Sequence, residues 1–270
     1  MACDRYAGES VNRAVQAHVD LADRHKAEAS FHNHKYATGD SFPRHYKVNP
    51  TYPVFLRLIN SLGNDLSGLR VLEYGCGTGW VTTELAKRGG HVSAFDISPE
   101  AVSQTASALR SQGLLAQCSV QVMAGEKLEY DSGVFDVAIG FAILHHLELT
   151  SALAELHRVL KPRGRALFAE PLGSNPLINL YRRLTPQFRT ADEAPIDLKN
   201  LARPASAFTR FEHRDQLLLA SAALGLCYLP GLSRAAPWTQ RHLMRLDDAI
   251  LQLAPWAGKW AWYSVLMLEK

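Results

Sequence analysis

Cysteine is scarce in this chain, and its few cysteines lie far apart. The four positions are Cys3, Cys76, Cys118 and Cys227. They have neither the paired spacing of a zinc site nor the density of a disulfide-stabilised scaffold. We therefore expect reduced thiols, as in a cytosolic protein.

Long hydrophobic runs and a large excess of basic charge are also missing. No apolar run approaches the ~20 residues that span a bilayer, and the first residues, MACDRYAGES, lack the pattern of a signal peptide. The net charge of +3 comes from 29 basic and 26 acidic residues spread along the chain, whereas binding to nucleic acid needs a concentrated basic stripe. These absences predict a cytoplasmic protein with no membrane segment and no nucleic-acid partner, and leave a homo-oligomer open.

From Leu69 onwards, short β-branched runs alternate with helical periodicities. This pattern is typical of βαβ units around a mostly parallel sheet. One predicted helix begins with Ser98 as its N-cap and Pro99 in its first turn. The predicted strands are 70–74, 91–95, 119–123, 135–141 and 166–169.

The remaining segments depart from this rhythm. Residues 171 to about 212 contain several prolines and arginines and no strand pattern, which predicts a helical insertion. We predict two units, an amino-terminal cap of residues 1–66 and an α/β domain of residues 67–270 that carries the insertion. After the insertion we predict a helix near 214–224, a strand near 227–229, a helix over 241–253 and a last strand at 262–268.

The segment VLEYGCGTGW at 71–80 places three glycines at alternate positions between a strand and a helix. Gly75, Gly77 and Gly79 would let the backbone turn tightly and approach a ligand where any Cβ would clash. Asp96 lies 21 positions after Gly75, at the end of the second strand, where a carboxylate can accept both ribose hydroxyls. These features predict a nucleoside-binding half-fold.

The glycine spacing indicates which of two kinds of nucleoside ligand the turn would bind. A pyrophosphate-binding turn has its third glycine one residue later, as GxGxxG, whereas this chain has GxGxG. Glu73, two residues before the first glycine, would repel a pyrophosphate and attract the ammonium group of a methionine moiety. The pattern therefore favours S-adenosylmethionine over a nicotinamide dinucleotide.

With these motifs, the chain resembles the class I S-adenosylmethionine-dependent methyltransferases from about Leu69 to Glu170, and more loosely to Lys270. Besides the glycine-rich motif and the ribose-binding acid, the matching segments are MAGEKL at 123–128, FDVAIGFAILHHL at 135–147 and LHRVLKPRGRALFAEP at 156–171. The resemblance implies an α/β fold with a seven-stranded, mostly parallel sheet of order 3-2-1-4-5-7-6 and helices on both faces. The cap and the insertion would close over the carboxyl edge of the sheet.

The resemblance also implies which residues contact the donor. In addition to Glu73, the three glycines and Asp96, these are Ile97, Met123, Gly125, Glu126 and Phe141. Many relatives carry an acid for the adenine amino group where this chain has Ala124, so backbone and apolar contacts are expected to hold adenine here. Residues 141–144 read FAIL and lack the signature of enzymes that methylate amide or exocyclic amino groups in macromolecules.

Three side chains are candidates for a catalytic base. His145 and His146 follow the fourth strand and Glu170 ends the fifth, so each would face an acceptor opposite the sulfonium. An imidazole suits a hydroxyl or a protonated amine, whereas a carboxylate suits the carbocation formed in C-methylation. We favour Glu170 because it abuts the insertion, although helix capping or salt bridging would also explain these residues.

We expect a small-molecule acceptor and no metal. Candidate substrate ligands are Tyr36 and Tyr46 in the cap and Arg182, Arg183 and Arg189 in the insertion. Guanidinium groups suit an anionic acceptor such as a carboxylic acid or a prenyl diphosphate, although a solvated helix face would also explain them.

Residues 1 to about 50 are predicted to act as a lid over the donor.

Several aspects of the function stay open. The methylated atom is left open among oxygen, nitrogen, sulfur and carbon. The alternative functions are an RNA or protein methyltransferase and a nucleotide-binding module without turnover.

Overall fold

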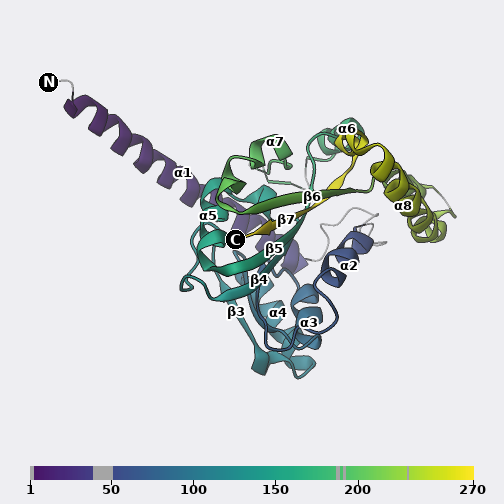
Figure 1. Cartoon of the computed structure of the whole chain (residues 1–270), viewed down its shortest axis with the longest axis horizontal. Coiled ribbons are helices and arrows are strands. Elements are labelled where there is room, and N and C mark those ends of the chain that lie inside the picture. Colours follow the sequence, from purple (N-terminus) through teal and green to yellow (C-terminus); the bar gives the residue numbers. More distant parts are fainter. Residues whose placement is uncertain (1–2, 39–50, 187–188, 191–192, 230) are drawn as a thin grey trace.

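A seven-stranded sheet forms the centre of the molecule, with strand order β3-β2-β1-β4-β5-β7-β6 (Figure 1). The computed structural model describes residues 3–38, 51–186, 189–190, 193–229 and 231–270. The order is the one that the family resemblance implies, so the predicted fold is confirmed. The strands are β1 (Arg70–Tyr74), β2 (His91–Asp96), β3 (Cys118–Val122), β4 (Phe135–Phe141), β5 (Leu160–Pro171), β6 (Arg210–Gln216) and β7 (Tyr263–Glu269).

Strand direction determines where a ligand can bind. Strands β1 to β5 pair in parallel, and β7 runs antiparallel between β5 and β6. The carboxyl ends of β1, β2, β4 and β5 therefore lie along one edge of the sheet, which is where open α/β folds bind their ligands.

Helices cover both faces of the sheet. The backbone alternation of a strand sends Val71 and Leu72 of β1 to opposite hydrophobic clusters, which explains why the strand is apolar throughout. One cluster includes residues of α5, and the other includes residues of α2 and α3. The α-helices are α1 (Cys3–Thr38), α2 (Tyr52–Asn60), α3 (Trp80–Lys87), α4 (Pro99–Ser111), α5 (Leu149–Val159), α6 (Pro176–Leu184), α7 (Leu198–Leu201) and α8 (Ala236–Leu253).

Most elements lie within a few residues of their predicted positions. The Ser98 side chain caps α4 as predicted, with its Oγ accepting a hydrogen bond from the Ala101 N–H at 3.2 Å. Among the described side chains, Cys76, Cys118 and Cys227 are free, and the reduced state of the thiols stays a prediction. The predicted helical insertion contains α6 and α7, but its last residues belong to β6.

The predictions of a helix near 214–224 and a strand near 227–229 are wrong. Residues 210–216 form the edge strand β6, and Ala220–Tyr228 is a 3₁₀ helix. Strand β6 pairs with β7 on one side, and its segment RFEHRDQ is mostly half-buried or exposed. An edge strand of this kind tolerates charged residues, so the apolar alternation that reveals a core strand is missing.

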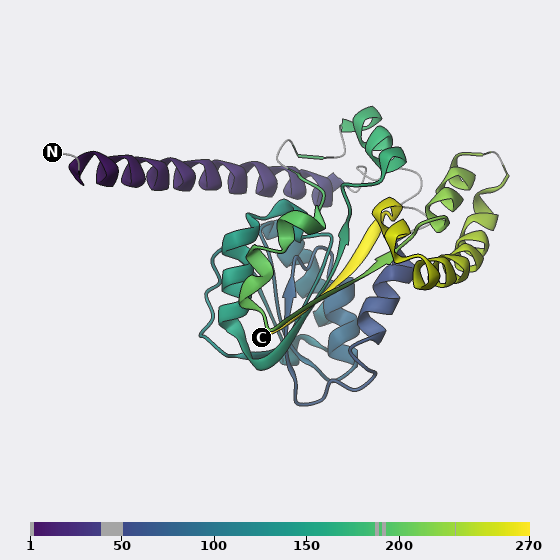
Figure 2. The ribbon, with the colours of Figure 1, turned by 45° about the horizontal axis from the view of Figure 1, so that its top comes forward.

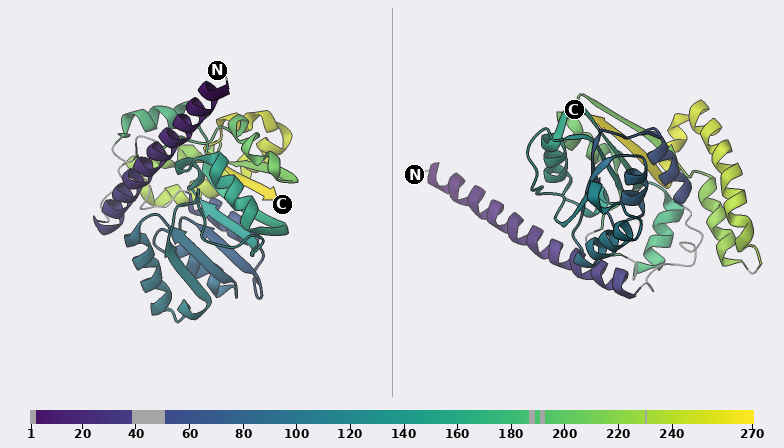
Figure 3. Two further views of the ribbon diagram at one scale, coloured as in Figure 1. Left: turned by 90° about the vertical axis from the view of Figure 1, so that its left-hand side faces the viewer. Right: turned by 90° about the horizontal axis from the view of Figure 1, so that it is seen from below.

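The two helices before β1 occupy different places. Val54, Leu58 and Ile59 of α2 are buried in the core of the sheet. Helix α1 projects from the body at its amino-terminal end, and α8 lies at the far end of the molecule's long axis (Figures 2 and 3). A separate cap of residues 1–66 stays a prediction. None of the described helices combines the length and apolarity needed to cross a membrane.

Candidate active site

A pocket lies at the carboxyl edge of the sheet, beneath the carboxyl-terminal half of α1. Its lining contains Gly75 after β1, Asp96 and Ile97 at the end of β2, and Phe141 at the end of β4. Met123, Ala124 and Gly125 follow β3 and also line it. The other lining residues are His25, Glu28, His32 and Tyr36 from α1, together with Phe95, Ala142, Ile143, His146 and Leu147.

The glycine-rich turn has the backbone conformation that its sequence predicts. Gly75, Gly77 and Gly79 have φ angles of +70°, +52° and +81°, in the region that favours glycine. A Cβ on Gly79 would lie 2.8 Å from Thr105 Cα, because α3 begins here against α4. The turn therefore needs glycine both for its conformation and for its packing.

Asp96 places a carboxylate at the pocket beside this turn. Its Oδ2 accepts a hydrogen bond from the Gly77 N–H at 3.0 Å, and its Oδ1 accepts one from the Ser98 N–H at 2.9 Å. Burial raises the pKa of Asp96, while these two backbone donors oppose the shift. The carboxylate is thus fixed in position and lines the cavity.

Glu73 lies beneath the turn, within the sheet. Burial raises its pKa to about 8, and its Oε2 is buried with no hydrogen-bond partner among the described residues. A carboxyl oxygen without a partner at this depth is suited to a cationic ligand group nearby. Asp96 lines the pocket, as a ribose-binding acid should, whereas Glu73 is not among the lining residues, so its predicted contact with an ammonium group stays a prediction.

The segment after β3 closes another side of the pocket. The Met123 N–H donates to the Asp96 carbonyl at 3.0 Å, which ties the segment to the end of β2. Glu126 does not line the pocket, because its Oε1 accepts from the Glu148 N–H at 2.9 Å and its Oε2 lies 3.1 Å from His25 Nε2. Glu126 therefore links α1 to the start of α5, and its predicted contact with the donor stays a prediction.

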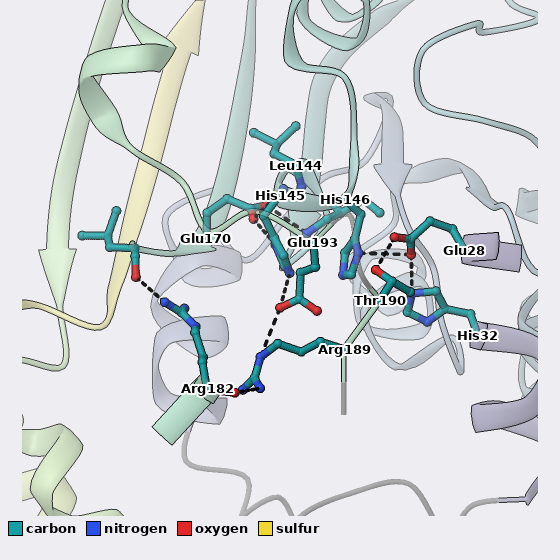
Figure 4. A network of polar contacts seen from close by, with 12 residues as sticks. Glu28, His32, Leu144, His145, His146, Glu170, Arg182, Arg189, Thr190 and Glu193 are labelled. Atoms are coloured by element: carbon teal, nitrogen blue, oxygen red, sulfur yellow. Dashed lines mark hydrogen bonds and ion pairs between the residues drawn. The ribbon is translucent and has the colours of Figure 1, made fainter. Parts of the chain in front are cut away.

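The turn after β4 is held by Glu170. Both Ile143 and Leu144 donate their backbone N–H groups to Glu170 Oε1 at 2.9 Å, and Glu170 Oε2 lies 2.8 Å from His145 Nδ1 (Figure 4). Burial raises the pKa of Glu170 to about 7, and burial together with the positive charge of Arg182 lowers the pKa of His145 to about 3. Neither side chain lines the pocket.

His146 is the member of the histidine pair that lines the pocket. Its Nδ1 lies 3.2 Å from Glu28 Oε2, and His32 Nε2 lies 3.3 Å from the same oxygen. Burial and the neighbouring His145 lower the pKa of His146. Burial alone would raise the pKa of Glu28, but contacts with His146 and His32 lower it overall.

Sequence reasoning missed Glu28 and His32. Their i, i+4 spacing, which places both on one face of a helix, is visible in the sequence. Their partner His146 lies more than a hundred positions away, and no local pattern joins it to them. Thr190, which donates a hydrogen bond to Glu28 Oε1, was also missed.

The predicted substrate ligands fall in different places. Tyr36 lines the pocket, and its hydroxyl would lie 3.1 Å from a Cβ on Gly77. Tyr46 is outside the described residues. Arg182 donates to the Leu172 carbonyl at 3.0 Å, and Arg189 donates to the Thr185 carbonyl at 2.7 Å.

Arg183 is exposed on α6. The three insertion arginines are not among the residues that line the pocket. Their binding to an anionic acceptor therefore stays a prediction.

Comparison with known proteins is consistent with this geometry. Residues 71–164 match a family model described as a methyltransferase domain. The chain is 30% identical to a ubiquinone biosynthesis O-methyltransferase of Hahella chejuensis, over 80% of this chain and 85% of the relative. It is 28% identical to the protein of the same name from Nitrosococcus oceani, over 91% of this chain and 98% of the relative.

Solved structures share the fold. A Haemonchus contortus phosphoethanolamine N-methyltransferase 2 in complex with S-adenosyl-L-methionine superposes with a TM-score of 0.59 at 16% identity, covering 80% of this chain and 51% of that one. A Streptomyces coelicolor geranyl diphosphate C-methyltransferase superposes with a TM-score of 0.57 at 14% identity, covering 79% and 77%. Three findings indicate the same family: the strand order, the glycine-rich turn and the similarity across most of the length of a relative. The chain therefore belongs to the class I S-adenosylmethionine-dependent methyltransferases that act on small molecules.

Proposed function

We propose that this enzyme methylates a hydroxyl oxygen of a small, largely apolar molecule and that His146 accepts the hydroxyl proton. The position of His146 carries the proposal, because it lines the pocket with Glu28 Oε2 3.2 Å from its Nδ1. A carboxylate at one ring nitrogen fixes the tautomer and stabilises the imidazolium, which leaves Nε2 for the acceptor. The lowered pKa of His146 keeps the imidazole neutral and able to take a proton near pH 7.

The residues around the pocket divide the remaining tasks. Asp96 would accept hydrogen bonds from the ribose hydroxyls, and the Met123–Gly125 backbone would flank adenine. Glu73, buried beneath the glycine-rich turn and not among the residues that line the pocket, would attract the ammonium group through its charge. The bound donor supplies an electrophilic methyl group on a positively charged sulfur. As the acceptor oxygen bonds to the methyl carbon, the carbon–sulfur bond breaks and the hydroxyl proton passes to His146 Nε2.

Two observations support oxygen over carbon as the methylated atom. The Glu170 carboxylate, suited to a carbocation, is directed at the backbone of the turn after β4 and does not line the pocket. The two relatives that the chain matches over 85% and 98% of their own length are named ubiquinone biosynthesis O-methyltransferases. Phe141, Ile143 and Leu147 give this side of the pocket an apolar lining suited to an aromatic hydroxyl compound.

Labelled methyl transfer tests the proposal. The enzyme is incubated with trideuteromethyl donor and a panel of phenols, amines and prenyl compounds, and the products are identified by mass spectrometry. We expect label on phenolic oxygen. His146→Gln should lower turnover roughly 10²-fold while the affinity for S-adenosylhomocysteine changes less than about twofold.

The matched control is His91→Gln, at the other end of β2 from the pocket, where the side chain is exposed. This variant should keep wild-type turnover. Methylation of amines or carbon alone would contradict the proposed acceptor. Wild-type turnover in His146→Gln would contradict the proposed proton acceptor.

A further inference from the structure

Three potential metal ligands meet where α1 crosses the turn after β4. Glu28 and His32 lie one helical turn apart on α1, and His146 reaches them from the turn after β4 (Figure 4). Their ligand atoms, one per residue, all lie within 4.8 Å of one another. Two imidazoles and one carboxylate form a common ligand set for divalent transition metals.

Two of these atoms are buried and make no hydrogen bond outside this cluster among the described residues. They are Glu28 Oε2 and His146 Nδ1. Glu28 is only 4% exposed, and Thr190 hydrogen-bonds to its other oxygen. Glu28 Oε2 and His146 Nδ1 face each other at 3.2 Å in an ion-pair contact, so a metal cation bound by both would replace the proton that this contact otherwise holds.

Two of the three separations between the ligand atoms match a tetrahedral site. Ligands about 2.0–2.1 Å from a zinc ion in tetrahedral geometry are separated from each other by about 3.3 Å. Glu28 Oε2 lies 3.3 Å from His32 Nε2 and 3.2 Å from His146 Nδ1. An ion would therefore need little rearrangement, and the mixture of nitrogen and oxygen favours Zn²⁺ or Co²⁺ over Mg²⁺ or Ca²⁺.

We propose that Glu28, His32 and His146 bind one divalent transition-metal ion of the Zn²⁺ class and that this ion inhibits methyl transfer. The inhibition rests on the proposed function of His146. With the metal on Nδ1, the neutral ring carries its proton on Nε2 and accepts none from the acceptor hydroxyl. The metal and the transferred proton therefore compete for one imidazole.

A second group of ligands lies next to the first and shares His146. It consists of His145, His146 and Glu193. His145 Nε2 lies 3.9 Å from Glu193 Oε1, while its Nδ1 is held by Glu170. The variant Glu193→Gln therefore tests which of the two groups binds the metal, since it removes a ligand from the second group alone.

Cobalt titration of the metal-free full chain tests the site. We expect one Co²⁺ per chain with the intense visible absorption of tetrahedral coordination, displaced by Zn²⁺. Glu28→Gln and His32→Gln should each weaken binding at least tenfold. Glu193→Gln and His34→Gln, the latter exposed on α1, should bind as the wild type does, and circular dichroism melts establish that each variant folds.

Turnover with Zn²⁺ and with a chelator is then compared within each variant. We expect Zn²⁺ to inhibit the wild type and to inhibit His32→Gln at least tenfold less effectively. Failure to bind Co²⁺, or binding that is lost in Glu193→Gln and kept in Glu28→Gln, would overturn the metal site and leave the proposed reaction standing. Tight Co²⁺ binding with no loss of turnover would instead overturn the role of His146 as proton acceptor.

Discussion

Oε2 of Glu170 lies 2.8 Å from Nδ1 of His145, although the two residues are 25 positions apart. The same carboxylate accepts the backbone N–H groups of Ile143, Leu144 and His145 in the turn after β4. The end of β5 thereby fixes the turn that presents His146 to the pocket. We infer from these contacts that Glu170 and His145 position the turn for the proposed reaction.

Glu170→Gln should lower turnover and preserve the fall in turnover at low pH that protonation of His146 causes. The glutamine side chain carries an NH₂ group, which would face the backbone N–H donors of the turn. A buried donor left without an acceptor costs about 1–3 kcal/mol of stability. Stability is measured by urea unfolding, and turnover is measured as a function of pH. His146→Gln should remove the pH-dependent part of the profile that Glu170→Gln retains. The reverse result would make Glu170 the base.

Asp96→Ala should weaken the binding of S-adenosylhomocysteine about 10- to 100-fold, because hydrogen bonds to a charged group contribute about 1.5–3 kcal/mol. Titration calorimetry measures the effect. Asp65→Ala is the control, since this exposed aspartate lies in the loop before β1 and hydrogen-bonds to Ser67. Unchanged affinity in a folded Asp96→Ala protein would exclude a contact between this carboxylate and the donor.

Glu73 should make the ligand-free enzyme less stable as the pH rises. Its pKa is raised from 4.5 to about 8 in the folded chain, so the unfolded chain loses its proton first. The unfolding free energy of the wild type should therefore fall relative to that of Glu73→Gln, by roughly 3 kcal/mol between about pH 5 and pH 8.

Urea unfolding of both proteins across this range measures the difference. S-adenosylhomocysteine, the demethylated donor that keeps the ammonium group, should reduce this difference in unfolding free energy, because a nearby positive charge stabilises the ionised carboxylate. A wild-type curve parallel to that of Glu73→Gln would show that Glu73 titrates normally.

Gly79→Ala should destabilise the protein more than Gly113→Ala. Both glycines have positive φ, at +81° and +70°, so alanine is strained at either position by about 1–2 kcal/mol. A Cβ at Gly79 would also meet the Thr105 backbone at 2.8 Å, whereas at Gly113 nothing lies within 4 Å. Overpacking adds about 1–3 kcal/mol.

Chemical denaturation of the two variants measures the difference. The Gly79→Ala variant should also bind the donor more weakly, since the turn must shift away from α4. Equal unfolding free energies would show that the contact with Thr105 relaxes without cost.

The sequence by itself determined the features that depend on local rules. A glycine turn, an N-cap serine and strands buried on both faces each leave a pattern within a few residues, because backbone conformation and side-chain periodicity are local properties. The glycine-rich turn and the cap at Ser98 were therefore predictable. Strand β6 was not, because an edge strand with exposed charged residues carries little apolar alternation.

Only the tertiary structure decided how the candidate catalytic residues divide their roles. His145 and His146 are adjacent in sequence, yet one contacts Glu170 and the other contacts Glu28. The difference arises because the turn after β4 directs the two rings to elements that are distant along the chain. Burial and partners, which set the pKa and the available ring nitrogen of each histidine, are properties of the assembled fold and leave no mark in neighbouring sequence.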